Sequence, residues 1–221
     1  MATPWDSPVG KDAEEIIFSI IRENCPCQTS NVRLLDFGAG NGRYLEMLNK
    51  QMPKGNLYGT EVDKERVAQI AQKGFNVVLL EEGRDCLPYE DDFFDVVFSS
   101  NVIEHIPESI YKRYLLEINR VLKEKGLFIV GTPNYPAKRF YDMYKALRTG
   151  FFKYYFFDDP THINKLSFKS LESDLKTAFG FVDLWPTYIL FENRLKFLQR
   201  KDVRQKLRFL GDKIMGFCVK K

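Results

Sequence analysis

At 221 residues, 44% of them hydrophobic, the chain has the size and apolar content of one α/β domain. No apolar run reaches the roughly 20 residues that span a bilayer, and the N-terminus lacks the pattern of a signal peptide, so we expect a cytoplasmic protein. The four cysteines are too scattered for a disulfide framework or a zinc site, and we predict no metal.

The N-terminal 30 residues are predicted to form a helix with an irregular lead before it. Asp12–Glu15 resembles a capping box, and the isoleucines after it follow a helical spacing to about Asn24. Trp5 lies in the lead. It either packs on the body of the protein or belongs to a lid over the site.

A strand, a tight turn and a helix are predicted from Val32 to about Gln51. The apolar run Val32–Phe37 contains Asp36 and is followed by Gly38, Gly40 and Gly42. Glycines are used where the backbone takes a positive φ or where a ligand approaches closely. The turn therefore predicts a site for a nucleotide-like ligand.

The next strand also ends in an acid. Residues 56–62 are predicted to be a short strand, and Glu61 lies 21 residues beyond Gly40. In dinucleotide-type folds a carboxylate at this spacing meets ribose hydroxyls, because the two strands pair and end together. A helix over 64–73 and a third strand over 75–80 follow, and residues 81–89 form a loop.

Two further strands are predicted at 93–98 and 127–131, with a helix through Leu122 between them. Strands that alternate with helices imply a parallel sheet whose ligands bind at the carboxyl ends of the strands. Five features fall at such ends: the glycine turn, Glu61, Asp85, Asn101 and Asn134.

The pattern changes after the fifth strand. Residues 136–165 are dense in aromatic and basic side chains and are interpreted as a cap inserted over the active face. A helix over 167–179, a sixth strand over 180–185, a basic segment with helical spacing over 194–210 and a last strand over 215–219 follow. The cofactor-binding core is thus 31–135, and 166–221 completes one domain.

Three ligands compete for the glycine turn. A dinucleotide site needs a third glycine where Arg43 stands, and a phosphate-binding loop needs a Lys-Ser/Thr pair that is absent. Asp36 would repel a pyrophosphate, whereas its charge suits the ammonium and sulfonium groups of S-adenosylmethionine.

The sequence resembles the class I S-adenosylmethionine-dependent methyltransferases, and most of all the small-molecule, type 11-like branch. The resemblance rests on five stretches in register: Leu34–Gly42, Tyr58–Asp63, Leu87–Tyr89 with Phe94–Val97, Asn101–Ile106, and Leu122–Phe128. It implies a Rossmann-like, doubly wound, mostly parallel sheet of seven strands with a last antiparallel strand and helices on both faces.

The resemblance also implies a cofactor, S-adenosyl-L-methionine, with S-adenosyl-L-homocysteine as the product. Asp36 would lie near the amino group of the methionine moiety, Glu61 would bind the ribose hydroxyls, and Asp85 would lie beside the adenine, a place that Glu81 or Glu82 could take instead. The full predicted cofactor set is Asp36, Phe37, Gly38, Ala39, Gly40, Glu61, Val62, Asp85 and Asn101.

The two histidines are the candidates for acid–base chemistry and acceptor contact, because a neutral imidazole accepts a proton near pH 7. His105 is predicted as the catalytic base, the alternative being a role at the start of a helix. Asn134, Tyr135 and His162 are predicted to contact the acceptor. The Asn/Asp-Pro-Pro-aromatic turn of base and glutamine methyltransferases is absent after Asn101, which favours an oxygen, a carbon or a small-molecule amine as the acceptor atom.

Basic charge is concentrated late in a chain whose net charge is only +3. Segments 137–157 and 194–213 suit an anionic or lipid-linked acceptor at a membrane surface, or are a solvated cap; a nucleic-acid partner is not favoured, and the oligomeric state stays open. A non-catalytic binding protein with the same fold is the alternative function. An NAD-dependent oxidoreductase is disfavoured by the glycine spacing.

Overall fold

The computed structural model describes residues 21, 23, 31–81, 86–135, 137–150, 159–187 and 200–221. The predicted N-terminal helix and Trp5 lie almost wholly outside these residues. Asp85, Glu82 and the aromatic run at 151–157 also lie outside them. The described residues include the whole predicted cofactor-binding core except for a short loop.

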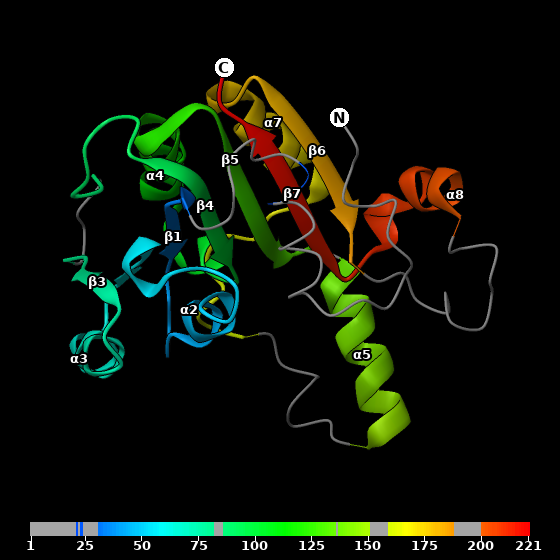
Figure 1. Cartoon of the computed structure of the whole chain (residues 1–221). Helices are drawn as coiled ribbons and strands as arrows, with labels where there is room; N and C mark the ends of the chain where they lie inside the picture. The colour runs from blue at the N-terminus through cyan, green and yellow to red at the C-terminus, as the bar shows by residue number, and fades with distance from the viewer. Residues whose placement is uncertain are drawn as a thin grey trace.

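One sheet of seven strands forms the centre of the molecule (Figure 1). Its spatial order is β3-β2-β1-β4-β5-β7-β6, and only β7 runs antiparallel to its neighbours. The last strand of the chain therefore lies between β5 and β6. The strands are β1 (Leu34–Phe37), β2 (Leu57–Glu61), β3 (Asn76–Leu79), β4 (Phe94–Ser100), β5 (Leu122–Pro133), β6 (Phe181–Pro186) and β7 (Lys213–Val219).

Helices cover both faces of the sheet, which confirms the predicted doubly wound fold. On one face α4 and α7 pack against a core that includes Phe128, and on the other α2 and α3 pack against a core that includes Val96. The described helices are α2 (Arg43–Leu48), α3 (Lys64–Gln72), α4 (Glu108–Val121), α5 (Ala137–Thr149), α7 (Phe168–Ala178) and α8 (Lys201–Lys206), with short 3-10 turns η3 (Lys54–Asn56), η4 (Ile103–His105) and η6 (Arg208–Leu210).

Alternation along β1 sets which way the first acid points. Leu34 belongs to the core beneath α2 and α3, whereas Leu35 and Phe37 belong to the core beneath α4. Because successive side chains of a strand point to opposite faces, Asp36 lies on the same face as Leu34. Glu61 lies on that face too, four residues after Leu57 of the same core.

Strand β5 differs from its prediction. The strand is predicted to start at residue 127, but it starts at Leu122. Lys125-Gly126 lies in a bulge within it, since β4 pairs Phe94 with Leu122 but Val96 with Leu127. Lys125 has a positive φ of 60°, which lets the bulge form. The early start of β5 adds pairing at the amino end of β4.

The cap and the basic segment are only partly described. Helix α5 extends from the end of β5 away from the sheet (Figure 1). Of the basic helix predicted over 194–210, the structure describes residues 200–210, where α8 covers six residues and η6 follows it. Among the described helices, none is long and apolar enough to cross a membrane.

Candidate functional site

The glycine turn connects β1 to α2 and is held against β2. Gly38, Gly40 and Gly42 all have a positive φ, of 80°, 55° and 78°. The backbone N–H groups of Gly38 and Ala39 both donate to the carbonyl of Thr60, at 3.0 and 2.8 Å. A Cβ added at Gly40 would meet no atom of the described residues within 4 Å, so none of them fills the space beside this turn. The turn thus presents bare backbone to a ligand.

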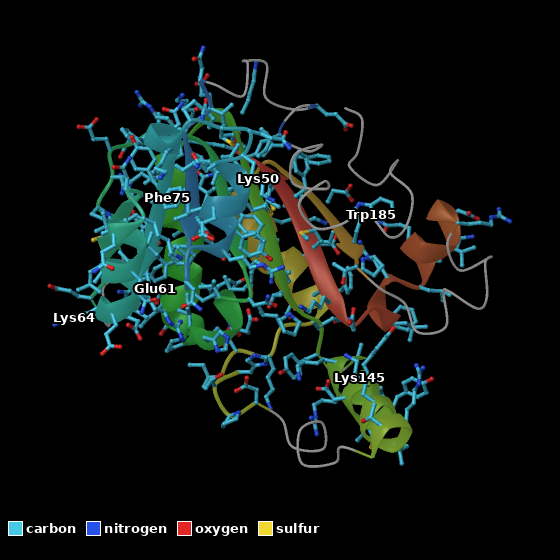
Figure 2. All side chains as sticks on the ribbon, turned by 60° about the horizontal axis from the view of Figure 1, so that its bottom comes forward. Lys50, Glu61, Lys64, Phe75, Lys145 and Trp185 are labelled. Carbon is cyan, nitrogen blue, oxygen red and sulfur yellow. The ribbon has the colours of Figure 1, made fainter. Side chains whose placement is uncertain are left out.

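Glu61 is fixed in place by backbone donors. Its Oε2 accepts from Gly40 N at 2.7 Å, and its Oε1 accepts from the N–H groups of Val62 and Asp63 at 2.9 and 3.1 Å. The residue is only 6% exposed. Figure 2 shows it among the side chains at the edge of the sheet. A carboxylate has about four acceptor positions, so these three bonds leave about one for a ligand.

Asp36 is a buried acid with an oxygen that has no partner. It is 1% exposed, and its Oδ2 has no hydrogen-bond donor within the part of the chain that the structure describes. Burial, and then the negative charge of Glu61, raise the pKa of Asp36 to about 7. A ligand that brings a cation or a donor to Oδ2 would relieve this cost.

The turn after β4 touches the glycine turn. Asn101 has a positive φ of 55°, its N–H donates to Gly131 O at 2.8 Å, and its side chain is exposed and donates to Ser100 Oγ at 3.3 Å. A Cβ on Gly38 would overlap the side chain of Val102. Glycine at this position therefore lets the turn after β4 lie against the glycine turn.

A second polar cluster lies at the carboxyl ends of β4 and β5. Glu104 is 1% exposed, and its Oε2 accepts from Thr132 Oγ1 at 3.0 Å while its Oε1 has no partner. Burial raises the pKa of Glu104, an effect opposed by hydrogen bonds that include that of Thr132 and by interaction with His105 and Lys213. The ionised form of Glu104 is therefore destabilised by burial.

The two histidines of the chain meet beside Glu104. Their ring centroids are 4.8 Å apart. His105 Nδ1 lies 3.1 Å from Thr161 O, and His162 Nδ1 lies 2.6 Å from Tyr135 Oη. The structure thus brings together three predicted site residues, His105, Tyr135 and His162.

The loop that contains His162 is fastened to η4. Asn164 N donates to Glu104 O at 2.9 Å, and Asn164 Nδ2 donates to Ile103 O at 3.3 Å. Asn164 is buried. These bonds position the histidine loop over the end of β4.

Asn134 has a structural position. Its side-chain N–H groups donate to the carbonyls of Phe209 and Gly211, at 3.0 and 2.6 Å, and its backbone N–H donates to Asp212 O at 2.9 Å. It lines a cavity of about 530 Å³ together with Tyr135 and Phe168. Both of its side-chain N–H groups already have partners. Its contact with the acceptor stays a prediction.

A match to a known family follows the same core. Residues 35–130 match the family described as "Methyltransferase domain". The central part of the chain is therefore similar to methyltransferase domains. The match starts at the first strand and ends in the fifth, so it includes both buried acids and the turn with His105. This confirms the type 11-like resemblance found in the sequence.

Two curated proteins match part of this chain. An uncharacterised protein of Methanocaldococcus jannaschii is 33% identical over 46% of this chain and 37% of its own length. The Bacillus subtilis protein YrhH, named as a candidate methyltransferase, is 29% identical over 45% of this chain and 57% of its own. The matched part of the chain therefore spans about a third to over a half of these relatives.

A solved structure shares the fold over nearly the whole chain. A SAM-dependent methyltransferase from Archaeoglobus fulgidus is 18% identical, covers 94% of this chain and 95% of its own, and has a TM-score of 0.63. This likeness shows that the chain has the Rossmann-like methyltransferase fold, and it covers more of the chain than the family match at residues 35–130.

Sequence reasoning missed Glu104, Thr132 and Thr161. Glu104 stands beside His105 in the sequence, but no local pattern marks it as a buried acid. The threonines touch the cluster through a hydroxyl and a carbonyl, which no local pattern marks. Asp85 lies outside the described residues, so its place beside the adenine stays a prediction.

Proposed function

We propose that this methyltransferase domain is an active S-adenosylmethionine-dependent enzyme that acts on a small-molecule acceptor. The main observation behind the proposal is the pair of buried acids at the ends of neighbouring strands. Asp36 has a buried oxygen without a donor, and Glu61 is held rigidly with one acceptor position left. The cofactor would supply a methyl group already activated by a sulfonium.

The donor groups of S-adenosylmethionine fit what the two acids lack. Its ammonium and sulfonium charges favour the ionised form of Asp36, and a ribose hydroxyl can donate to Glu61. The resemblance gives both ribose hydroxyls to Glu61. The geometry of Glu61 supports one such bond, with a second only if a backbone donor is exchanged.

An apolar surface lies next to the proposed ribose position. Val62 follows Glu61 directly and is 64% exposed, which is high for a valine at the end of a buried strand. An adenine ring packed there would cover apolar surface. This supports the prediction that Val62 contacts the cofactor.

Calorimetric titration tests the cofactor. We expect S-adenosylmethionine and S-adenosylhomocysteine to bind and NAD to give no heat. Glu61→Gln should weaken binding about 30-fold, or roughly 2 kcal/mol, because the amide offers one acceptor fewer and faces backbone donors. Asp63→Asn is the matched control, since Asp63 caps α3 through Glu65 N and Arg66 N and an asparagine retains that role. Heat with NAD alone would refute the cofactor.

The acceptor is proposed to bind beside His105, Tyr135 and His162, next to the glycine turn. Methyl transfer is an in-line displacement, so positioning the acceptor supplies much of the rate. The prediction that His105 acts as general base fits its hydrogen bond to Thr161 O, because that carbonyl holds the proton on Nδ1 and leaves Nε2 as the acceptor.

The acceptor could be methylated at oxygen, carbon or nitrogen, and α5 favours a lipid- or glycan-linked molecule. Phe140, Met143 and Leu147 are exposed on this helix, and Lys145 and Arg148 lie among them. Aromatic and basic side chains together suit an anionic or lipid-linked molecule. A labelled methyl group followed from the cofactor into a fractionated cell extract tests this, and label in the organic phase is the expected result. Firm cofactor binding without any labelled product would instead indicate a non-catalytic binding protein.

A further inference from the structure

Glu104, His105 and His162 gather three metal-ligating side chains at the carboxyl ends of β4 and β5. One carboxylate oxygen and one ring nitrogen from each histidine lie within 4.8 Å of one another. From this geometry we propose that the three residues bind one divalent metal ion of the Zn²⁺, Fe²⁺, Mn²⁺ or Co²⁺ class. Two imidazoles and one carboxylate are a ligand set that such ions use.

The unpartnered oxygen of Glu104 is the second observation that points to a ligand. Among the described residues Glu104 Oε1 is buried without a donor, while Oε2 accepts from the hydroxyl of Thr132. A buried carboxylate oxygen without a partner is expensive, and a cation bound to it removes that cost. Thr132 is then a positioning residue that orients the carboxylate.

Both histidines have partners that suit metal ligation. Thr161 O can only accept, so His105 Nδ1 donates to it and Nε2 presents its lone pair. His162 Nδ1 lies 2.6 Å from Tyr135 Oη; when Nδ1 donates to that oxygen, Nε2 can bind a cation. Nε2 already faces a negative charge, because Asp159 Oδ2 lies 3.7 Å away. Metal-bound histidines commonly donate their other N–H group in this way.

Metal binding requires a small contraction of the cluster. Ligands about 2.1 Å from a tetrahedral ion lie roughly 3.4 Å apart. The present spacing of up to 4.8 Å therefore has to close by up to about 1.4 Å. His105 is exposed, so its ring can turn without displacing core atoms, and Glu104 and His162 can remain where their hydrogen bonds hold them.

The position of the site indicates what the metal would do. This role rests on the proposed function, whereas metal binding itself does not. Val102 packs on Gly38 two residues before Glu104, so the metal would lie next to the glycine turn. Three protein ligands leave coordination positions open for an oxygen of the acceptor. A metal on His105 Nε2 would occupy the nitrogen that a general base needs, so the two roles exclude each other.

The test measures metal binding by the full chain without cofactor or acceptor. Zn²⁺ and Co²⁺ are the probes, added to chelator-treated protein. We expect one equivalent to bind, Co²⁺ to give visible ligand-field bands, and both imidazole NMR signals to move on addition of one equivalent of Zn²⁺. The chain has only two histidines, so every imidazole signal belongs to the proposed site.

Substitutions separate this site from other metal-binding groups. Glu104→Gln and His162→Gln should each weaken Zn²⁺ binding at least tenfold. Glu108→Gln is the matched acid control, since Glu108 is exposed and pairs with Lys112 at 2.6 Å. A Cys25→Ser/Cys27→Ser/Cys86→Ser variant should bind as the wild type does, because no cysteine takes part.

Three results would overturn the proposal. The first is equal affinity in Glu104→Gln, His162→Gln and wild type, and the second is loss of binding in the cysteine variant. The third is a pair of unmoved imidazole signals in the wild type at one equivalent of Zn²⁺, which decides the matter even where a variant fails to fold. Cofactor binding is measured separately, so loss of one activity does not imply loss of the other.

Discussion

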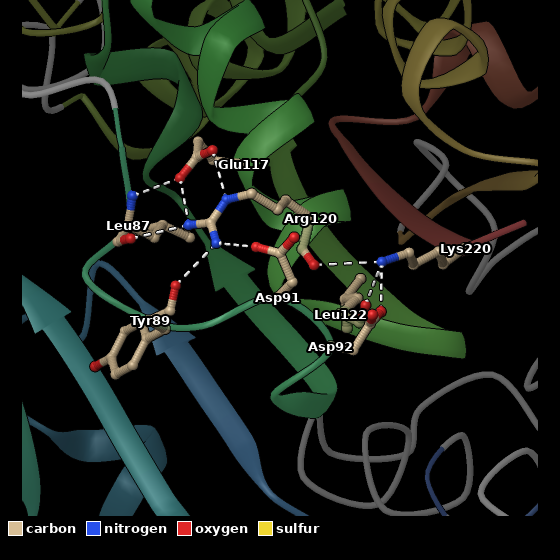
Figure 3. A network of polar contacts seen from close by, with 8 residues as sticks. All are labelled: Leu87, Tyr89, Asp91, Asp92, Glu117, Arg120, Leu122 and Lys220. Carbon is tan, nitrogen blue, oxygen red and sulfur yellow. Dashed lines mark hydrogen bonds and ion pairs between the residues drawn. The ribbon is translucent and has the colours of Figure 1, made fainter.

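Two groups of charged side chains lie at opposite ends of the sheet, and they differ in how completely their polar atoms are paired. At the amino ends of β4 and β5, the Arg120 guanidinium makes five hydrogen bonds, to both oxygens of Glu117, to Asp91 and to the carbonyls of Leu87 and Tyr89 (Figure 3). Its five N–H donors allow no more.

Two acids at the carboxyl ends of the strands each have one carboxylate oxygen that is not hydrogen-bonded within the described residues. Asp36 Oδ2 and Glu104 Oε1 are both buried and have no hydrogen-bond partner among the residues of the described ranges. Native proteins pair nearly all of their buried polar atoms, so unpaired ones call for an explanation. The paired network is expected to hold the fold, and the unpaired acids are expected to hold ligands. Substitutions at the two ends should therefore affect different measurements.

The largest expected effect is on folding, from Arg120→Ala. The change leaves Glu117, which is partly buried, with the Leu87 N–H in place of the Arg120 donors, and it removes the Arg120 donor from two loop carbonyls. We expect the free energy of unfolding to fall by about 3 kcal/mol, measured by urea denaturation, because one partner of a paired charge is removed. Cofactor affinity of the folded protein should be unchanged.

Arg113→Ala is the control for that substitution. Arg113 lies on the same helix, α4, and is exposed, so its loss should change stability by less than about 0.5 kcal/mol. Equal effects of the two substitutions would contradict the view that the Arg120 network stabilises the fold.

Asp36→Asn should have a smaller effect, and in the opposite direction. The pKa of Asp36 is raised to about 7 from 3.8, so the folded protein binds more protons than the unfolded chain between these values. Wild-type stability should therefore fall as the pH rises from about 4 to 7. At pH 8 the asparagine variant, which removes a buried charge, should be more stable by about 2 kcal/mol, and the difference should shrink to near zero by about pH 4.

The same group links cofactor binding to pH. If the cofactor's cationic groups need the ionised Asp36, the affinity of the wild type rises as the pH rises through about 7, and that of Asp36→Asn is weaker and flat. Calorimetry across pH 6 to 8 measures both. A pH-independent wild-type affinity would remove Asp36 from the cofactor site, while the stability comparison would still stand.

The amino acid sequence predicts the arrangement of β1 to β4 and the position of the two acids closely, because apolar runs, glycines and the 21-residue spacing are local signals. Glu61 indeed meets the glycine turn, through Gly40 N. The bulge in β5 escaped prediction, since Lys125-Gly126 has the composition of a turn and only pairing with β4 shows otherwise.

The cluster around Glu104 could not be predicted in the same way. Glu104 and His162 are separated by the whole cap, which has no periodicity that fixes where its end returns. What brings them together is Asn164, whose backbone and side chain donate to Glu104 O and Ile103 O. Such side chain to backbone bonds depend on the folded geometry and leave no pattern in the sequence.

The smallest expected effect concerns Lys220, at the edge of the paired network. Its ammonium group donates to Asp92 Oδ1 at 2.8 Å and to the carbonyls of Leu122 and Arg120, at 2.6 and 3.3 Å (Figure 3). Lys220→Met keeps the stem but leaves these acceptors without a donor, so stability should fall by about 1 kcal/mol. Lys221→Met, at the exposed next residue, is the control and should be neutral. Equal unfolding midpoints for the two variants would mean that Lys220 does not stabilise the fold and that the stabilising network ends at Arg120. A fully paired side chain at this end of the sheet would then not always be a stabilising one.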